Sequence, residues 1–277
     1  MAPLPPLLDH YALLLSWLAQ HSRLSLLALT MVAAGVLACV TILGFGVRTP
    51  YGRYSRAGWG PTMPARFAWV LQEAPTPILV LMALAVRDEK TLRWSLSPSE
   101  VAHCLLALHY VHRAFIYPLQ IQNGKPTPVT IAAMAFAFCL YNGAMQSAML
   151  VHQLDDVTWA PLTVFGLVLM VYGALENVRA DTVLRSLRRN APPNAPRYRT
   201  PPSVGLFQFV SGANFLGEIL EWCGYSALCG LHLPAVAFAA FTALNIGPRA
   251  IHHHAFYLQK LDGYSKLGRR ALIPFLL

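Results

Sequence analysis

The sequence predicts an all-α protein that crosses a membrane several times. Hydrophobic residues make up 56% of the 277 positions and charged residues only 12%, whereas a soluble domain usually carries about 25% charged residues. The mean hydropathy is +0.46, and the apolar residues fall into runs long enough to cross ~30 Å of hydrocarbon. The net charge is +9, and most of the Lys and Arg residues lie between these runs or after the last one. This distribution indicates membrane topology rather than nucleic-acid binding, because no basic soluble module is visible.

Seven apolar runs are candidate transmembrane helices. In chain order they cover residues 26–47, 67–86, 101–119, 129–150, 161–178, 206–228 and 233–254. The second run contains Pro75 and Pro77, which should break or kink its helix because proline lacks a backbone N–H. No internal repeat is visible. We therefore expect residues 26–277 to form one seven-helix domain, preceded by an N-terminal extension (1–25) that lies at the membrane interface.

Basic residues in the connections predict the orientation of these helices. They lie in the first, third and fifth loops and in the tail: Arg48, Arg53, Arg56, Arg66, Lys125, Arg179, Arg185, Arg188, Arg189, Arg197, Arg199, Lys260, Lys266, Arg269 and Arg270. Lys and Arg are enriched on the cytoplasmic side, so the N-terminus is expected outside and the C-terminus in the cytoplasm. Arg87, Lys90 and Arg93 in the second loop oppose this assignment and are partly offset by Asp88 and Glu89.

The seventh run ends in three adjacent histidines, in the stretch "RAIHHHAFYL". Successive helical residues turn about 100° from one another, so the three imidazoles cannot all face one metal ion. No metal site is therefore predicted. Arg249, His253 and Tyr257 fall on one stripe at a spacing of four, which points His253 towards the interior. The alternative is a basic cluster at the end of a membrane helix.

The sixth run carries a second polar stripe, in "SGANFLGEILEWCGY". Asn214, Glu218, Glu221 and Tyr225 share one helix face with Gly217, and acids inside a membrane span are costly and usually functional. A structural ion pair with Arg249 is the alternative. Elsewhere, Glu73 lies inside the second run and Tyr110 in the third. A transporter and an intramembrane enzyme could both use such polar groups.

Several motifs resemble the steroid 5α-reductase (3-oxo-5α-steroid 4-dehydrogenase) family. They are "FAWVLQEAP", "LHYVHRAFIYP", "FCLYNGAMQS", "LENVRADTVLRSLRR", "SGANFLGEILEWCGY", "RAIHHHAFYL" and the final "RRALIPFLL", in the family's order over residues 48–277. The resemblance implies seven transmembrane helices around NADPH and a Δ4-3-oxo steroid. Ser203 and Val204 depart from the family, in which we expect glycine.

The resemblance also implies roles for individual residues. Glu73 and Tyr110 would meet the 3-oxo oxygen of the steroid. Tyr51, Arg53 and Lys125 would contact the pyrophosphate region of NADPH. The remaining nucleotide contacts would come from Asn177, Asp181, Arg188, Tyr198, Arg199, Asn214, Glu218, Arg249, His253 and Tyr257.

The residue types suit this chemistry. No glycine-rich Rossmann fingerprint is present, so the phosphates would be held by arginines, whose fork binds phosphate bidentately. Hydride addition to C5 of a conjugated enone places negative charge on the 3-oxo oxygen, and each donor aimed at it contributes about 3–4 kcal/mol. Tyr110 supplies a hydroxyl. A low dielectric favours the neutral acid of Glu73, which can also donate.

The sequence thus predicts an NADPH-dependent oxidoreductase that converts 3-oxo-Δ4 steroids, such as testosterone or progesterone, into 5α-3-oxosteroids. The expected partners are a lipophilic steroid and membrane lipid, with no nucleic acid and no obligate protein partner. The membrane would be a bacterial inner membrane or the endoplasmic reticulum. The alternatives are a related intramembrane reductase or methyltransferase acting on another sterol, enoyl lipid or isoprenoid, and a transporter or receptor without NADPH.

Overall fold

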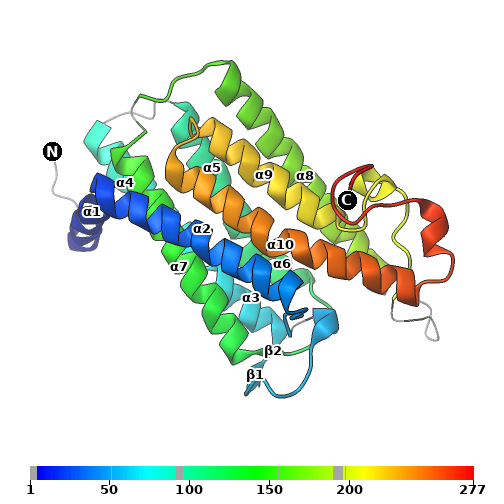
Figure 1. Ribbon diagram of the computed structural model, residues 1–277. Helices are drawn as coiled ribbons and strands as arrows, with labels where there is room; N and C mark the ends of the chain where they lie inside the picture. The colour runs from blue at the N-terminus through cyan, green and yellow to red at the C-terminus, as the bar shows by residue number, and fades with distance from the viewer. Residues whose placement is uncertain (1–4, 51, 92–95, 155, 190–195, 197) are drawn as a thin grey trace. The chain divides into compact units, whose positions relative to one another are not determined.

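The computed structural model is mostly α-helical (Figure 1). It describes residues 5–50, 52–91, 96–154, 156–189, 196 and 198–277, without the side chains of residues 88–91 and 188. The α-helices are α1 (Pro6–Leu18), α2 (His21–Gly44), α3 (Ala65–Glu73), α4 (Pro75–Thr91), α5 (Pro98–Val111), α6 (Tyr117–Gln120), α7 (Val129–His152), α8 (Pro161–Arg189), α9 (Ala213–Leu228) and α10 (Leu233–Lys260). Short helical turns are η1 (Gly52–Tyr54), η2 (His112–Ile116), η3 (Gly205–Gln208) and η4 (Tyr264–Leu267), and strands β1 (Thr62–Met63) and β2 (Thr127–Pro128) pair antiparallel.

Each of the seven predicted spans falls on helical structure. Within the described residues, four helical stretches are long and apolar enough to cross a membrane: His21–Gly44, Ala65–Arg87, Val129–His152 and Pro161–Leu187. The protein therefore has the helices of a membrane protein. Crossing by the other three predicted spans, and the direction of all of them, stay predictions.

The sixth predicted span starts too early. Its helix begins at Ala213, not at residue 206. The backbone N–H groups of Ser211 and Gly212 bond to the carbonyls of Arg270 and Ala271 in the C-terminal tail, and Arg270 N–H bonds to the Phe209 carbonyl. These groups are engaged by the tail and cannot join a helical ladder. An apolar sequence alone does not reveal such a partner.

The chain divides into two compact units. Unit 1 contains Met1–Met31, Thr49–Leu167 and Tyr225–Phe238, and unit 2 contains Val32–Arg48, Val168–Gly224 and Ala239–Leu277. Each unit gathers segments that are distant in the sequence.

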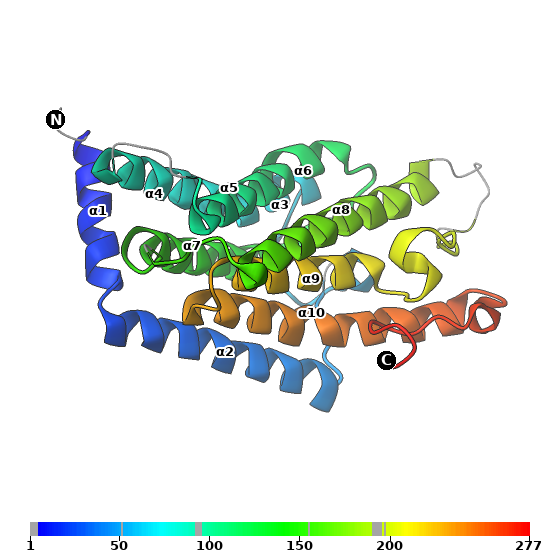
Figure 2. The same ribbon diagram turned by 90° about the horizontal axis from the view of Figure 1, so that it is seen from above.

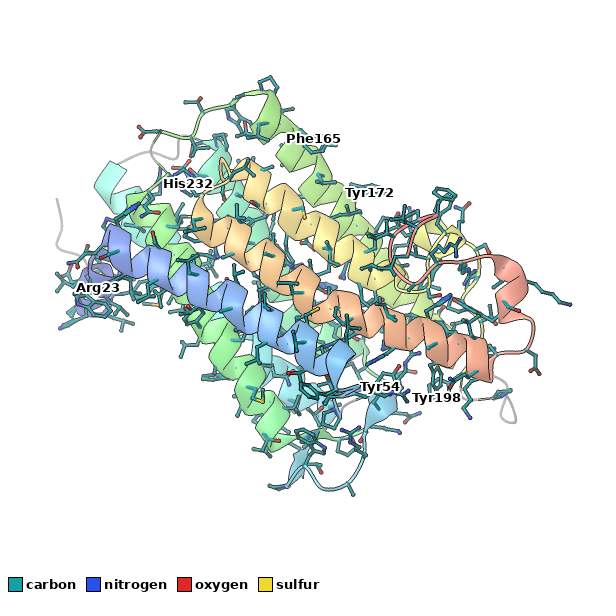
Figure 3. All side chains as sticks on the ribbon, in the orientation of Figure 1. Arg23, Tyr54, Phe165, Tyr172, Tyr198 and His232 are labelled. Atoms are coloured by element: carbon teal, nitrogen blue, oxygen red, sulfur yellow. The ribbon has the colours of Figure 1, made fainter. Side chains whose placement is uncertain are left out.

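In unit 1, α4 packs against α5 and α7, and α3 packs against α7. A buried ion pair joins Arg87 Nε to Glu100 Oε1 at 3.4 Å. The N-terminal extension forms α1, which docks on α4 through a hydrogen bond from the Tyr11 hydroxyl to the Leu79 carbonyl (3.0 Å). The chain turns at residues 19–20 into α2, and Arg23 in the first turn of α2, labelled in Figure 3, stacks 4.0 Å from the Trp17 ring. The placement of the N-terminal extension at a membrane interface stays a prediction.

In unit 2, α8 and α9 lie side by side (Figures 1 and 2). Glycines make this contact close. A Cβ added at Gly173 of α8 would stand 2.3 Å from the Glu221 nitrogen of α9, and one added at Gly217 would stand 2.6 Å from the Asn177 nitrogen. Any larger residue at either position would push the two helices apart. This contact fixes the distance between the polar faces that α8 and α9 carry.

Candidate active site

Glu73 lies at a break in the second predicted span. Helix α3 ends at Glu73 and α4 begins at Pro75, which confirms the predicted interruption. Pro75 and Pro77 have no N–H to donate, so the carbonyls of Leu71 and Glu73 cannot receive the usual i+4 helical bond. The predicted catalytic acid thus sits where regular helical hydrogen bonding stops.

The carboxyl group of Glu73 lies against α7. The Cys139 thiol donates to Glu73 Oε2 at 3.7 Å, and Cys139 is 3% exposed. The Thr76 hydroxyl donates to the Cys139 carbonyl at 2.9 Å, which ties the start of α4 to the same turn of α7. A thiol is a weak donor, so this contact orients the carboxyl group without strongly solvating its charge. No sequence pattern indicated this role for Cys139.

Tyr110 lies near the end of α5 and is 5% exposed. Its ring meets the His109 ring edge-on, with centroids 5.2 Å apart. Two residues later the chain enters a π-helical segment, η2. Such segments occur mostly as single turns within α-helices, often at functional sites. The π-helical segment was not predicted, because no residue type specifies one.

Arg113, in the π-helical segment, lies against two aromatic rings that also contact each other. Its guanidinium lies 4.6 Å from the Trp69 ring centre and 4.8 Å from that of Tyr117, and the two rings meet edge-on at 4.9 Å. Arg113 and Glu73 both interact electrostatically with the Cys139 thiol, and α3 packs against η2. Unit 1 therefore gathers an acid, a buried phenol and an arginine around α3, α5 and η2.

Two predicted phosphate contacts, Arg53 and Lys125, lie on loops of unit 1. Arg53 is part of η1 and Lys125 precedes β2, and both are half-buried. The loops are joined by the β1–β2 ribbon and by Arg66, whose Nε and Nη2 donate to the Ile121 carbonyl at 2.9 and 2.7 Å. Tyr51, predicted alongside Arg53, lies outside the described residues.

Four predicted nucleotide contacts form one hydrogen-bonded cluster in unit 2. Asn177 Nδ2 of α8 donates to the Asn214 carbonyl at 2.9 Å and to Glu218 Oε2 at 3.4 Å. Asn214 Nδ2 of α9 donates to Asp181 Oδ1 at 3.2 Å. The cluster thus presents two amides and two carboxylates from facing turns of α8 and α9. Because glycines hold the helices close, these groups are positioned by backbone contact.

The three histidines of α10 have three different surroundings. His253 lies against Phe215, with ring centroids 5.0 Å apart. His254 Nδ1 lies 2.7 Å from Ser211 Oγ, which also contacts the Tyr264 hydroxyl at 2.8 Å. His252 interacts electrostatically with Arg48. Among the described residues, no group of three or more His, Cys, Asp and Glu side chains could hold a metal ion.

The rest of the predicted nucleotide set lies around α10 and the segment before η3. Arg249 Nη2 donates to Asn245 Oδ1 at 2.9 Å, and Tyr257 is 3% exposed. Tyr198, labelled in Figure 3, meets Phe256 edge-on at 5.0 Å. Arg199 Nη2 donates to the Leu187 carbonyl, which joins this segment to the end of α8. The side chain of Arg188 lies outside the described residues.

Comparison with known proteins decides the family. The sequence profile described as 3-oxo-5-alpha-steroid 4-dehydrogenase matches residues 125–277. The bovine (Bos taurus) 3-oxo-5-alpha-steroid 4-dehydrogenase 1 is 38% identical over 262 residues, which cover 94% of this chain and 99% of that protein. The chain belongs to the 3-oxo-5-alpha-steroid 4-dehydrogenase family. The predicted resemblance is thereby confirmed, as is membership of an oxidoreductase family.

Other members of the family show similar agreement. The human (Homo sapiens) 3-oxo-5-alpha-steroid 4-dehydrogenase 1 is 39% identical over 229 residues, covering 82% of this chain and 85% of its own. The rat (Rattus norvegicus) 3-oxo-5-alpha-steroid 4-dehydrogenase 2 is 39% identical over 256 residues, covering 89% and 94%. The 262 residues shared with the bovine protein exceed the 230 positions from 48 to 277. Similarity to the family therefore extends into the first predicted span.

Proposed function

We propose that this protein is an NADPH-dependent enzyme that reduces the Δ4 double bond of 3-oxo-Δ4 steroids to 5α-3-oxosteroids. The observation that carries the proposal is its 38–40% identity, over most of the chain, to proteins named 3-oxo-5-alpha-steroid 4-dehydrogenases. The polar groups of unit 1 and unit 2 support it separately, because each set suits one half of the reaction.

In unit 1, Glu73 and Tyr110 would polarise the 3-oxo group. Both are potential donors: Tyr110 is 5% exposed, and the half-buried Glu73 contacts a buried thiol through its carboxyl group. A donor placed where negative charge develops stabilises the transition state more than the ground state. Tyr110 would donate its hydroxyl proton in a hydrogen bond, and Glu73 would donate as the neutral acid.

In unit 2, the cluster of Asn177, Asp181, Asn214 and Glu218 would hold the nucleotide. Its chemistry fits NADPH: carboxylates accept hydrogen bonds from ribose hydroxyls, and amides pair with the polar edges of the nicotinamide and adenine rings. Arg199 and Arg249 supply guanidinium groups suited to phosphate. When bound, NADPH supplies a hydride for C5 of the steroid. The residues of this unit bind and orient the cofactor.

The membrane would supply the substrate. We propose that all seven predicted spans cross the bilayer within one domain formed by residues 26–277, with the N-terminus outside and the basic loops in the cytoplasm. A steroid dissolves in lipid and would enter sideways from the bilayer. Large apolar side chains exposed on the long helices, such as Leu37, Leu81 and Val168, suit contact with lipid.

The first test is incubation of detergent-purified protein with NADPH and testosterone or progesterone, followed by product mass and C5 stereochemistry. A gain of two hydrogens with 5α geometry supports the proposal. NADPH binding without steroid product would redirect it to another unsaturated lipid, and folded protein that binds no NADPH would refute it. Glu73→Gln should lose at least ~100-fold in steroid turnover and keep its NADPH affinity. Normal turnover by this variant would refute the role of Glu73.

A further inference from the structure

Glu176 is a buried acid of α8 to which the proposed reaction assigns no role. Its side chain is 7% exposed. Glu176 Oε2 accepts a hydrogen bond from the backbone N–H of Leu206 at 3.0 Å, across 30 residues of sequence. Glu176 Oε1 accepts from Arg179 Nη1 at 2.7 Å. The carboxylate therefore links α8 to the η3 turn that precedes α9.

The η3 turn is shaped to receive this carboxylate. Gly205 has a φ of +51°, a left-handed conformation that favours glycine. A Cβ at this position would also stand 2.5 Å from Glu176 Oε2. The preceding Val204 is extended, with φ −127° and ψ 145°, so glycine is required at 205 and not at 204. This explains how the chain tolerates the departure at Ser203 and Val204.

The turn held by Glu176 joins parts of the proposed nucleotide site. Arg199 lies seven residues before Leu206 and Asn214 lies eight residues after it, while Asn177 directly follows Glu176 on α8. A second link comes from the tail: Arg269 Nη2 donates to the Pro201 carbonyl at 2.9 Å and to Ser203 Oγ at 3.0 Å. The segment between Arg199 and Asn214 is thus fixed from two sides.

We infer that Glu176 is a positioning residue for nucleotide binding, because it holds the segment from Arg199 to Asn214 against α8. The inference rests on the proposed function, since it concerns the NADPH site of that reaction. Glu176 acts by accepting the Leu206 N–H, and it does not itself touch the cofactor. Losing this acceptor frees the turn, so that the arginine and the asparagine on either side must be ordered again when NADPH binds.

The bond to Leu206 N–H, and not the ion pair with Arg179, is the contact that matters. The Arg179 side chain is 60% exposed, and exposed ion pairs contribute little because water screens them. A charged acceptor that satisfies a buried backbone donor is stronger. Removing Arg179 should therefore leave the turn in place, whereas removing the carboxylate should release it.

The test compares Glu176→Ala, Glu176→Gln and the matched control Arg179→Met in detergent-purified full-length protein. NADPH affinity is measured by fluorescence titration, KM for NADPH and kcat by steroid turnover, and the exposure of residues 203–209 by hydrogen exchange without nucleotide. Glu176→Ala should weaken NADPH binding about tenfold, raise KM for NADPH with kcat at saturation little changed, and speed exchange of this segment. Glu176→Gln keeps an acceptor and should recover most of the affinity. Arg179→Met should resemble the wild type.

A double-mutant comparison tests the steric fit. Gly205→Ala alone should be strongly impaired, whereas Gly205→Ala in the Glu176→Ala background should lose less additional affinity because the 2.5 Å clash with Oε2 is gone. Unchanged NADPH affinity and unchanged exchange of residues 203–209 in Glu176→Ala would overturn the inference. So would equal losses in Glu176→Ala and Arg179→Met. Wild-type protein that binds no NADPH would instead overturn the proposed function, and with it the nucleotide role of Glu176.

Discussion

Substituting Gly173 by alanine should separate the two helices that carry the nucleotide cluster. The new Cβ would lie 2.3 Å from the Glu221 backbone nitrogen and 2.6 Å from the Gly217 carbonyl oxygen. Contacts below 3.0 Å essentially never occur for a real Cβ, so the helices must separate locally by about 0.7 Å. Neither obstacle is a flexible side chain, so the shift has to come from the helix backbones.

This shift is large enough to break the cluster. Adding it to the 2.9 Å bond from Asn177 to the Asn214 carbonyl gives about 3.6 Å, and adding it to the 3.4 Å bond to Glu218 gives about 4.1 Å. Neither distance is a hydrogen bond. Overpacking of this kind costs about 1–3 kcal/mol of stability, and the displaced amides should weaken NADPH binding about tenfold or more.

The assay is NADPH titration together with thermal unfolding of Gly173→Ala. The matched control is Gly247→Ala on α10, where a Cβ would meet Leu272 Cδ2 at 3.5 Å, an ordinary contact. The control should keep wild-type affinity and stability. If Gly173→Ala binds NADPH as tightly as the wild type and unfolds at the same temperature, the cluster is not positioned by this helix contact.

Three further changes test other parts of the molecule. Tyr110→Phe removes one donor to the 3-oxo oxygen of the steroid and should lower kcat about 100-fold, with NADPH affinity unchanged. A variant in which only the KM for the steroid changes, with kcat as in the wild type, would contradict that role. Arg113→Lys loses the planar group that lies against the rings of Trp69 and Tyr117, so steroid turnover should fall while NADPH titration stays normal. Full activity would show that charge alone suffices. Burial raises the pKa of Tyr264 above its usual 10.0, so its contribution to stability is complete below about pH 10 and lost as pH rises through the folded-state pKa. Thermal midpoints between pH 9 and 11 should therefore fall less steeply for Tyr264→Phe than for the wild type, and equal slopes would contradict the assignment.

The helical spacing of the sixth predicted span correctly indicated that its polar residues share one helix face. Asn214 and Glu218 share a turn of α9, and Asn177 and Asp181 share a turn of α8. Helical spacing fixes which residues share a face, but it does not say which faces meet. Here Gly173 and Gly217 allow α8 and α9 to pack closely. A glycine in an apolar run does not indicate which helix it will contact.

The sequence was least informative where the backbone leaves regular helix. The start of α9 was placed too early because residues 206–212 are as apolar as the helix that follows. The N–H groups of Ser211 and Gly212 bond to the C-terminal tail, some 60 residues away along the chain. The role of Glu176 could not be predicted either, because its partner is the backbone N–H of Leu206 in a turn. No side-chain pattern indicates such a bond.

The two predicted catalytic residues lie beside interruptions of helical hydrogen bonding. Glu73 ends α3 two residues before Pro75, and Tyr110 lies two residues before the start of the π-helical segment η2. A regular helix consumes its own backbone polar groups, which is why it is tolerated in lipid. An interruption leaves backbone groups that need other partners and turns side chains away from the regular helical register. Because α3 packs against η2, the two interruptions belong to one region of unit 1, and both predicted catalytic side chains come from helix segments next to a break in regular hydrogen bonding.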